Sequence, residues 1–103
     1  MEEKTSFLKQ KIDFENPNRN IVPITTSIGS DGKLSIGGCS IEELVKKYDS
    51  PLYILDEITL RNSCRAYKKA LEKYYPGESL PIYASKANSS IFMSNLVSSE
   101  GLG

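Results

Sequence analysis

The chain has no histidine, only two cysteines and no long hydrophobic run among its 103 residues. Without histidine, these residues alone cannot supply a Ser-His-Asp or Cys-His catalytic group, a histidine metal ligand or a histidine proton shuttle. Cys39 and Cys64 lie far apart, without a Cys-x-x-Cys spacing. The spacing favours neither a disulfide framework nor a zinc site, and we expect no metal.

The chain also lacks an excess of either charge, because thirteen basic residues balance thirteen acidic ones. This balance argues against a nucleic-acid partner, which would favour a basic patch. No apolar run approaches the roughly 20 residues that a membrane span needs. The N-terminus, Met1-Glu2-Glu3-Lys4, leads into no apolar stretch and so indicates no secretory signal. We therefore expect a cytoplasmic protein without a membrane partner.

The first half of the chain contains the signals of a hairpin and a short helix. Residues 1–23 are polar and turn-rich, which predicts a mobile lead-in. Between residues 24 and 36, apolar and polar residues alternate on both sides of Asp31-Gly32, a pattern typical of a β-hairpin. Ser40-Ile41-Glu42-Glu43 forms a capping box and predicts a helix with one buried face, which Pro51 ends. Cys39 directly precedes this cap and is expected to pack beside it.

From Pro51 onward, strand and helix patterns alternate. The apolar runs 52–55 and 80–85 predict buried strands, and Asp56 is the expected cap of a helix that runs to about Tyr75. The charged residues between 61 and 73 are expected to form a solvated face of that helix. Ser89 or Ser90 can cap a further helix, after which Gly101 adopts the left-handed conformation. The apolar stripe of the long helix comprises Leu60, Cys64, Tyr67, Leu71 and Tyr74.

This rhythm is typical of parallel βα units, so the predicted fold class is α/β. A closed (β/α)8 barrel takes about 250 residues. An open sheet of two parallel strands would leave both edges unpaired. We therefore expect the chain to be the opening segment of a larger protein.

Lys86 is the candidate catalytic residue, because it terminates an apolar strand although lysines are mostly found on surfaces. Alternation would place Ala84 and Lys86 on one face of the strand and Ser85 on the other, toward the helices. In a parallel barrel, this end of a strand faces the active-site mouth, where small Ala84 leaves room for a flat ligand. Partial desolvation lowers a lysine's pKa, and the neutral amine can form a Schiff base with the aldehyde of pyridoxal 5'-phosphate (PLP). The alternative is a strand-end lysine that only extends into water.

A resemblance to a known family supports the catalytic interpretation. Ile82-Tyr83-Ala84-Ser85-Lys86-Ala87-Asn88 resembles the Tyr-Ala-Val-Lys-Ala-Asn motif of the PLP-dependent decarboxylases with an alanine-racemase-like barrel. Stretches 32–38, 50–57, 60–62 and 100–103 resemble, in order, parts of the diaminopimelate decarboxylase family. The resemblance covers roughly residues 30–103, and Ser85 replaces the usual valine.

The resemblance implies a PLP-binding (β/α)8 barrel whose first βα units are residues 51–103. It also implies that residues 24–50, the hairpin and short helix, lie on the side of a C-terminal β domain. Lys86 would hold PLP as a Schiff base, with Lys86 and Ala84 as cofactor-binding residues. The substrate would be a small amino acid, meso-2,6-diaminopimelate, which is converted to L-lysine and carbon dioxide.

The resemblance further implies a homodimer when the protein is full length. The family's other active-site groups lie downstream of the residues matched here, so the 103 residues alone are expected to be inactive. An ornithine or arginine decarboxylase of the same fold remains an alternative, as does a non-catalytic homologue. A soluble α/β segment with an incidental strand lysine is a further alternative.

Overall fold

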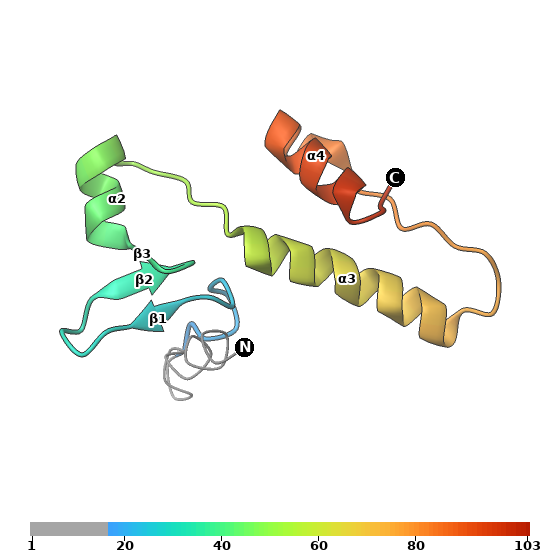
Figure 1. Cartoon of the computed structure of the whole chain (residues 1–103), viewed down its shortest axis with the longest axis horizontal. Helices are drawn as coiled ribbons and strands as arrows, with labels where there is room; N and C mark the ends of the chain where they lie inside the picture. The colour runs from blue at the N-terminus through green and yellow to red at the C-terminus, as the bar shows by residue number, and fades with distance from the viewer. Residues whose placement is uncertain (1–16) are drawn as a thin grey trace. The chain divides into compact units, whose positions relative to one another are not determined.

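The computed structural model describes residues 17–103, which divide into a unit that ends at Thr59 and a unit from Leu60 to Gly103 (Figure 1). The greater part of the predicted lead-in, residues 1–16, lies outside the described residues, and residues 17–21 form turns and a bend begins at position 22. The elements in order are β1 (Ser27–Ile28), β2 (Leu34–Ile36), β3 (Cys39–Ser40), α2 (Ile41–Tyr48), α3 (Glu57–Tyr74), η1 (Ser85–Ala87) and α4 (Ile91–Ser99).

The first unit contains a small antiparallel sheet in the order β1-β2-β3. Ser27 pairs with Ser35, which confirms the predicted hairpin, and Gly32 takes a positive φ of 76° in its turn. The Asp31 carboxylate accepts a hydrogen bond from the Lys33 amide at 3.0 Å and so holds the same turn. The sequence did not predict β3, which pairs with β2 after a second tight turn.

Helix α2 begins as predicted, because the Ser40 hydroxyl accepts a hydrogen bond from the Glu43 amide at 3.5 Å. The prediction of a buried face on α2 is wrong. Its apolar side chains are half-buried, and Tyr48 is 57% exposed. The helix packs on β2 and β3, and a sheet this small covers only part of a helix face. Cys39, expected to pack beside this cap, is exposed.

A chain of polar contacts fixes the start of α3. Asp56 Oδ2 accepts hydrogen bonds from the backbone amide of Thr59, at 3.1 Å, and from the Thr59 hydroxyl. The Thr59 hydroxyl oxygen in turn accepts one from the Ile24 amide at 3.0 Å. The prediction that Asp56 caps this helix is therefore confirmed, and Thr59 also connects this cap to the turn that precedes β1 within the first unit.

The predicted strands at 52–55 and 80–85 are wrong for the described residues, which form no strand in either segment. Nor is the second segment buried, since Leu80 is 61% and Ile82 is 76% exposed. A strand is defined by its partners, and neither segment has a ladder partner of sufficient length here. One element of parallel pairing is nevertheless present. The Gly103 amide donates to the Pro81 carbonyl at 3.0 Å, and the Tyr83 amide donates to the Gly103 carbonyl at 2.9 Å.

These two bonds flank Ile82 and both use Gly103, which is the pattern of a parallel ladder. The chain therefore follows the order of a βαβ unit. Segment 81–83 takes the place of the first strand, α4 is the crossover helix, and Gly103 is the first residue of the parallel neighbour. Segment 81–83 pairs with a single residue, which is too few for a regular strand.

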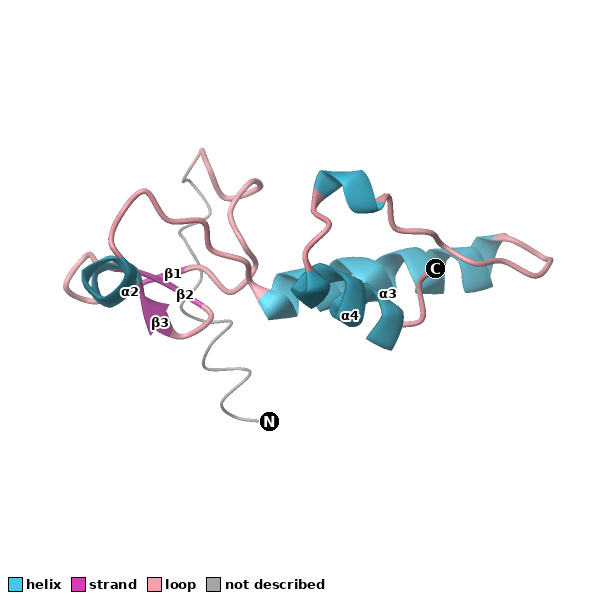
Figure 2. Ribbon diagram, turned by 90° about the horizontal axis from the view of Figure 1, so that it is seen from above, coloured by secondary structure: helices cyan, strands magenta, loops and turns pink. Residues whose placement is uncertain are grey.

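The second unit has a small core between α3 and α4, which lie side by side in Figure 2. Cys64 of α3 is buried with three residues of α4, and partly buried residues pack around them. Ser90, one of the two predicted caps, accepts a hydrogen bond from the Met93 amide at 3.3 Å. Gly101 has a φ of 84°, as predicted. The core residues of α4 are Met93, Leu96 and Val97, and the surrounding residues are Leu60, Tyr83 and Leu102.

Candidate active site

Lys86 lies in the 3-10 turn η1 and is exposed. The expected strand alternation therefore does not reach it, because the backbone turns at Ser85, where Ala87 donates to the Ala84 carbonyl at 3.1 Å. Ser85 is exposed and does not point toward a helix core as predicted. Ala84 precedes the turn in an extended conformation and is also exposed. The two candidate site residues thus lie two positions apart on one short turn.

Both ends of this turn are attached to neighbouring structure. Before it, the backbone of Tyr83 is bonded to Gly103. After it, the Asn88 side-chain oxygen accepts a hydrogen bond from the Ser90 amide at 3.1 Å, at the start of α4. The Tyr83 hydroxyl donates to the Asn88 carbonyl at 3.1 Å and so joins the two ends. The backbone that carries Lys86 is therefore held at both sides, whereas the lysine side chain is exposed.

A groove of about 350 Å³ lies next to the turn within the second unit. Apolar side chains of α3 and α4 line it together with residues 81–84, Ala87 and Leu102. Ala84 is a lining residue and Lys86 is not. The sequence pattern suggested that the two would share one face, and the structure instead places only Ala84 at the groove.

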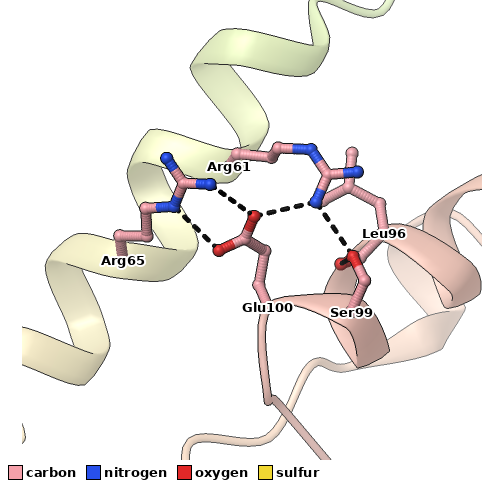
Figure 3. A network of polar contacts seen from close by, with 5 residues as sticks. All are labelled: Arg61, Arg65, Leu96, Ser99 and Glu100. Atoms are coloured by element: carbon pink, nitrogen blue, oxygen red, sulfur yellow. Dashed lines mark hydrogen bonds and ion pairs between the residues drawn. The ribbon is translucent and has the colours of Figure 1, made fainter.

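Glu100, the residue that directly follows α4, binds two arginines of α3 (Figure 3). Arg61 Nη1 lies 2.8 Å from Glu100 Oε1, and Arg65 Nε lies 2.9 Å from Oε2. A second bond from Arg65 Nη2 to Oε1 at 3.0 Å makes the Arg65 contact bidentate. Arg61 also donates to the Ser99 hydroxyl at 2.9 Å, and that hydroxyl donates to the Leu96 carbonyl at 2.7 Å.

These contacts change the acidity of the carboxylate. The hydrogen bond from Arg65 and, to a smaller extent, that from Arg61 lower the pKa of Glu100. The hydrogen bond to Glu100 in turn raises the pKa of Arg65. The charged residues of α3 were expected to form a solvated face, and Arg65 is exposed as expected, whereas Arg61 is only half-exposed. The contact of both arginines with Glu100 was not predicted. Charge pattern along one helix cannot reveal a partner that lies 35 or more residues away.

The described residues, 17–103, contain no candidate metal site and no membrane-spanning helix. Within this part of the chain, no group of three or more histidine, cysteine, aspartate or glutamate side chains is arranged to hold a metal ion. Nor does any helix here combine the length and apolarity that crossing a bilayer requires.

Comparison with known proteins identifies relatives over most of the chain. It is 48% identical over 88 residues to a protein of Synechocystis sp. named diaminopimelate decarboxylase, a match that covers 85% of this chain and 19% of the relative. Proteins of the same name from Bacillus methanolicus and Archaeoglobus fulgidus are 37% and 34% identical, over 76% and 72% of this chain and 18% and 16% of the relatives. No family model matches the chain, and no solved structure matches it significantly.

The chain thus spans about a fifth of the length of the curated relatives that it matches. The resemblance that its motifs indicated is confirmed by relatives from bacteria and an archaeon that carry the same name. The chain is therefore related by sequence to the diaminopimelate decarboxylase family, as a segment about a fifth as long as these relatives.

Proposed function

We propose that this chain is the N-terminal part of a PLP-dependent diaminopimelate decarboxylase, in which Lys86 holds the cofactor through its side-chain amine. The complete enzyme would convert meso-2,6-diaminopimelate to L-lysine and carbon dioxide. The observation that carries this proposal is the 48% identity over 88 residues to a protein named for that activity. The lysine motif at positions 83–88 adds a residue of suitable chemistry.

The geometry around Lys86 fits a covalently held aldehyde cofactor. The amine is exposed and makes no hydrogen bond or ion pair with any of the residues from 17 to 103, so an aldehyde can approach it. Ala84, two positions before Lys86, has only a methyl side chain, which leaves room for a flat ring. When bound, PLP would supply an electron sink for the electron pair that remains as the carboxyl group leaves. The contribution of this chain is to present the amine from a backbone that is tied at both ends.

The wider architecture of the proposed enzyme is a (β/α)8 barrel that begins with residues 51–103. The parallel pairing of Ile82 with Gly103 supports this arrangement, since parallel strands joined by a helix are the unit of such a barrel. Tyr53, fully exposed here, and Ile82 lie in the two segments expected as barrel strands. In a barrel, both faces of a strand are covered, which would bury such side chains. We also propose that residues 24–50 belong to a β domain, that the complete enzyme is a homodimer, and that it is cytoplasmic.

The test replaces Lys86 by methionine in the complete protein that carries this chain. Lys86→Met removes the amine while it keeps a side chain of similar length. We expect loss of the PLP absorbance band and a fall in carbon dioxide release of about a hundredfold or more. Lys69→Met is the matched control, because Lys69 is also exposed and lies on α3. Full PLP binding and activity in Lys86→Met would disprove the role of Lys86.

The same preparation decides between substrates. A protein that releases carbon dioxide from ornithine or arginine, and not from diaminopimelate, would replace the proposed substrate with one of these. A complete wild-type protein that forms no adduct at Lys86 after borohydride reduction in the presence of PLP would instead be a non-catalytic homologue.

A further inference from the structure

We propose that Tyr83 is a positioning residue whose hydroxyl group closes the turn that presents Lys86. The inference rests on the proposed function in one respect, namely that Lys86 is the residue that holds the cofactor. The bond between the Tyr83 hydroxyl and the Asn88 carbonyl, 3.1 Å long, spans the whole of η1. Lys86 is one of the four residues, 84–87, that lie between the two ends of this bond.

Within that interval the turn has little structure of its own. Inside it, a backbone hydrogen bond runs from the Ala87 amide to the Ala84 carbonyl, across a 3-10 helix of three residues. The hydrogen bonds of a 3-10 helix have poorer geometry than those of an α-helix. The residues of the turn are exposed, so packing adds little to hold them. The bond from Tyr83 is therefore a large part of what restricts the backbone at Lys86.

Tyr83 is suited to this role because its own position is fixed. Its ring packs against the buried cluster of Cys64, Met93, Leu96 and Val97. Its backbone amide is bonded to the Gly103 carbonyl at 2.9 Å. The hydroxyl is thus a donor on a rigid support, and it reaches across to a carbonyl on the far side of the lysine.

The acceptor is fixed as well, by a contact that does not involve Tyr83. The Asn88 side chain accepts from the Ser90 amide, and the Ser90 hydroxyl caps α4. The Tyr83 bond therefore connects the core on one side of Lys86 to the start of α4 on the other. A residue that acts in this way touches neither the amine nor the cofactor, and it narrows the range of positions from which the amine reacts.

The experiment compares Tyr83→Phe with Tyr67→Phe in the complete protein that carries this chain. Tyr83→Phe keeps the ring in the core and removes only the hydroxyl donor. Tyr67 lines the same groove, is 68% exposed, and its hydroxyl bonds to none of the described residues, so Tyr67→Phe is the matched control. Amide hydrogen exchange of the peptide 84–90 is measured without PLP. PLP affinity is then measured by titration of the apoprotein.

For Tyr83→Phe we expect exchange of the peptide to be about two- to tenfold faster and PLP affinity to be weaker by a similar factor, the range for loss of one neutral hydrogen bond. Both quantities should stay at the wild-type value in Tyr67→Phe. Unchanged exchange in Tyr83→Phe would overturn the proposal, as would faster exchange with unchanged PLP affinity.

The outcome separates this inference from the proposed function. If the wild-type protein bound no PLP at Lys86, the proposed function would fail and Tyr83 could not position a cofactor lysine. The exchange measurement would still report whether its hydroxyl closes the turn. If wild-type protein bound PLP and Tyr83→Phe behaved as wild type in both measurements, only the role of Tyr83 would fail.

Discussion

Glu100 illustrates how one side chain determines where the last residues of this chain lie. Its side chain is 9% exposed, and its carboxylate accepts three hydrogen bonds from the guanidinium groups of Arg61 and Arg65. Glu100 directly precedes Gly101, where the chain turns. Two residues later, Gly103 pairs with the segment that carries Lys86. A bidentate arginine contact fixes the orientation of the carboxylate as well as its distance from the guanidinium group. The network thus holds the end of α4 against α3 at the point where the parallel pairing begins.

The depressed pKa of Glu100 predicts a pH-dependent stability. A carboxyl group whose pKa is lower in the folded than in the unfolded protein stabilises the fold fully above its unfolded value, about 4.3 for glutamate. This stabilisation is lost as the pH falls through the lower, folded pKa. Glu100→Gln should therefore lower the melting temperature at pH 7, and its difference from wild type should shrink in acid.

Thermal unfolding, followed by circular dichroism across this pH range, checks the expectation. Glu72→Gln is the matched control, because Glu72 is exposed and also lies on α3. It should melt close to wild type at every pH. A Glu100→Gln deficit that is as large at about pH 2 as at pH 7 would show that the charge is not responsible.

At the scale of residues, local signals were readable in the sequence and distant contacts were not. Asp56, Ser90 and Gly101 have roles that depend on the three or four residues next to them. The roles of Asp56 and Gly101 were predicted correctly, and Ser90 was one of two predicted caps. The contact between Arg61 and Glu100 joins residues 39 positions apart, and the sequence of α3 does not predict it. The exposure of Cys39 was missed for the same reason, because it depends on what the hairpin leaves uncovered.

At the scale of elements, a helix forms its backbone hydrogen bonds within itself, whereas a strand needs a neighbouring strand to form them. The predicted helices end within a residue or two of α2, α3 and α4, since periodicity and caps are carried by the helix itself. The segments 52–55 and 80–85 have strand-like sequences, but a strand also needs neighbours. Only Ile82 has one, in Gly103. The sequence therefore predicts which segments favour extended structure, whereas pairing depends on the rest of the fold.

The cap of α4 gives a prediction at this scale. The Ser90 hydroxyl accepts from the Met93 amide, and loss of such a cap costs about 1 kcal/mol. Ser90→Ala should destabilise the first turn of α4 by about this amount, which hydrogen exchange of its amides measures. Ser89→Ala is the control, because the sequence left both serines as candidates and only Ser90 caps the helix. Equal effects of the two substitutions would contradict the assignment of the cap.

At the scale of the whole molecule, the chain has a small core for its apolar content. Four hydrophobic residues are buried in the described part, whereas Tyr53, Ile82 and Ile91 are among the large apolar side chains left exposed. Monomeric proteins rarely leave large contiguous apolar patches uncovered. In the proposed barrel, further strands and helices would cover these side chains. Sequence reasoning reached this architecture through a motif resemblance, because periodicity within 103 residues cannot specify how many strands close a sheet.

The same scale carries the last prediction, which concerns what these 103 residues do by themselves. They supply one candidate amine, at Lys86, and contain no histidine. Decarboxylation requires, besides that amine, groups that bind the substrate, fix the bond to be broken and deliver a proton. We therefore expect the purified chain, mixed with PLP and diaminopimelate, to release carbon dioxide no faster than free PLP in the same buffer.

The matched experiment assays the complete protein and the 103-residue chain at equal concentration, with trapped labelled carbon dioxide as the readout. The complete protein should turn over its substrate, and Lys86→Met in that protein should reduce the rate toward that of the chain. Turnover by the 103-residue chain well above free PLP would mean that Lys86 and its neighbours suffice for the reaction. The proposed dependence on groups outside this segment would then be wrong, even though the lysine itself would be confirmed as the reactive residue.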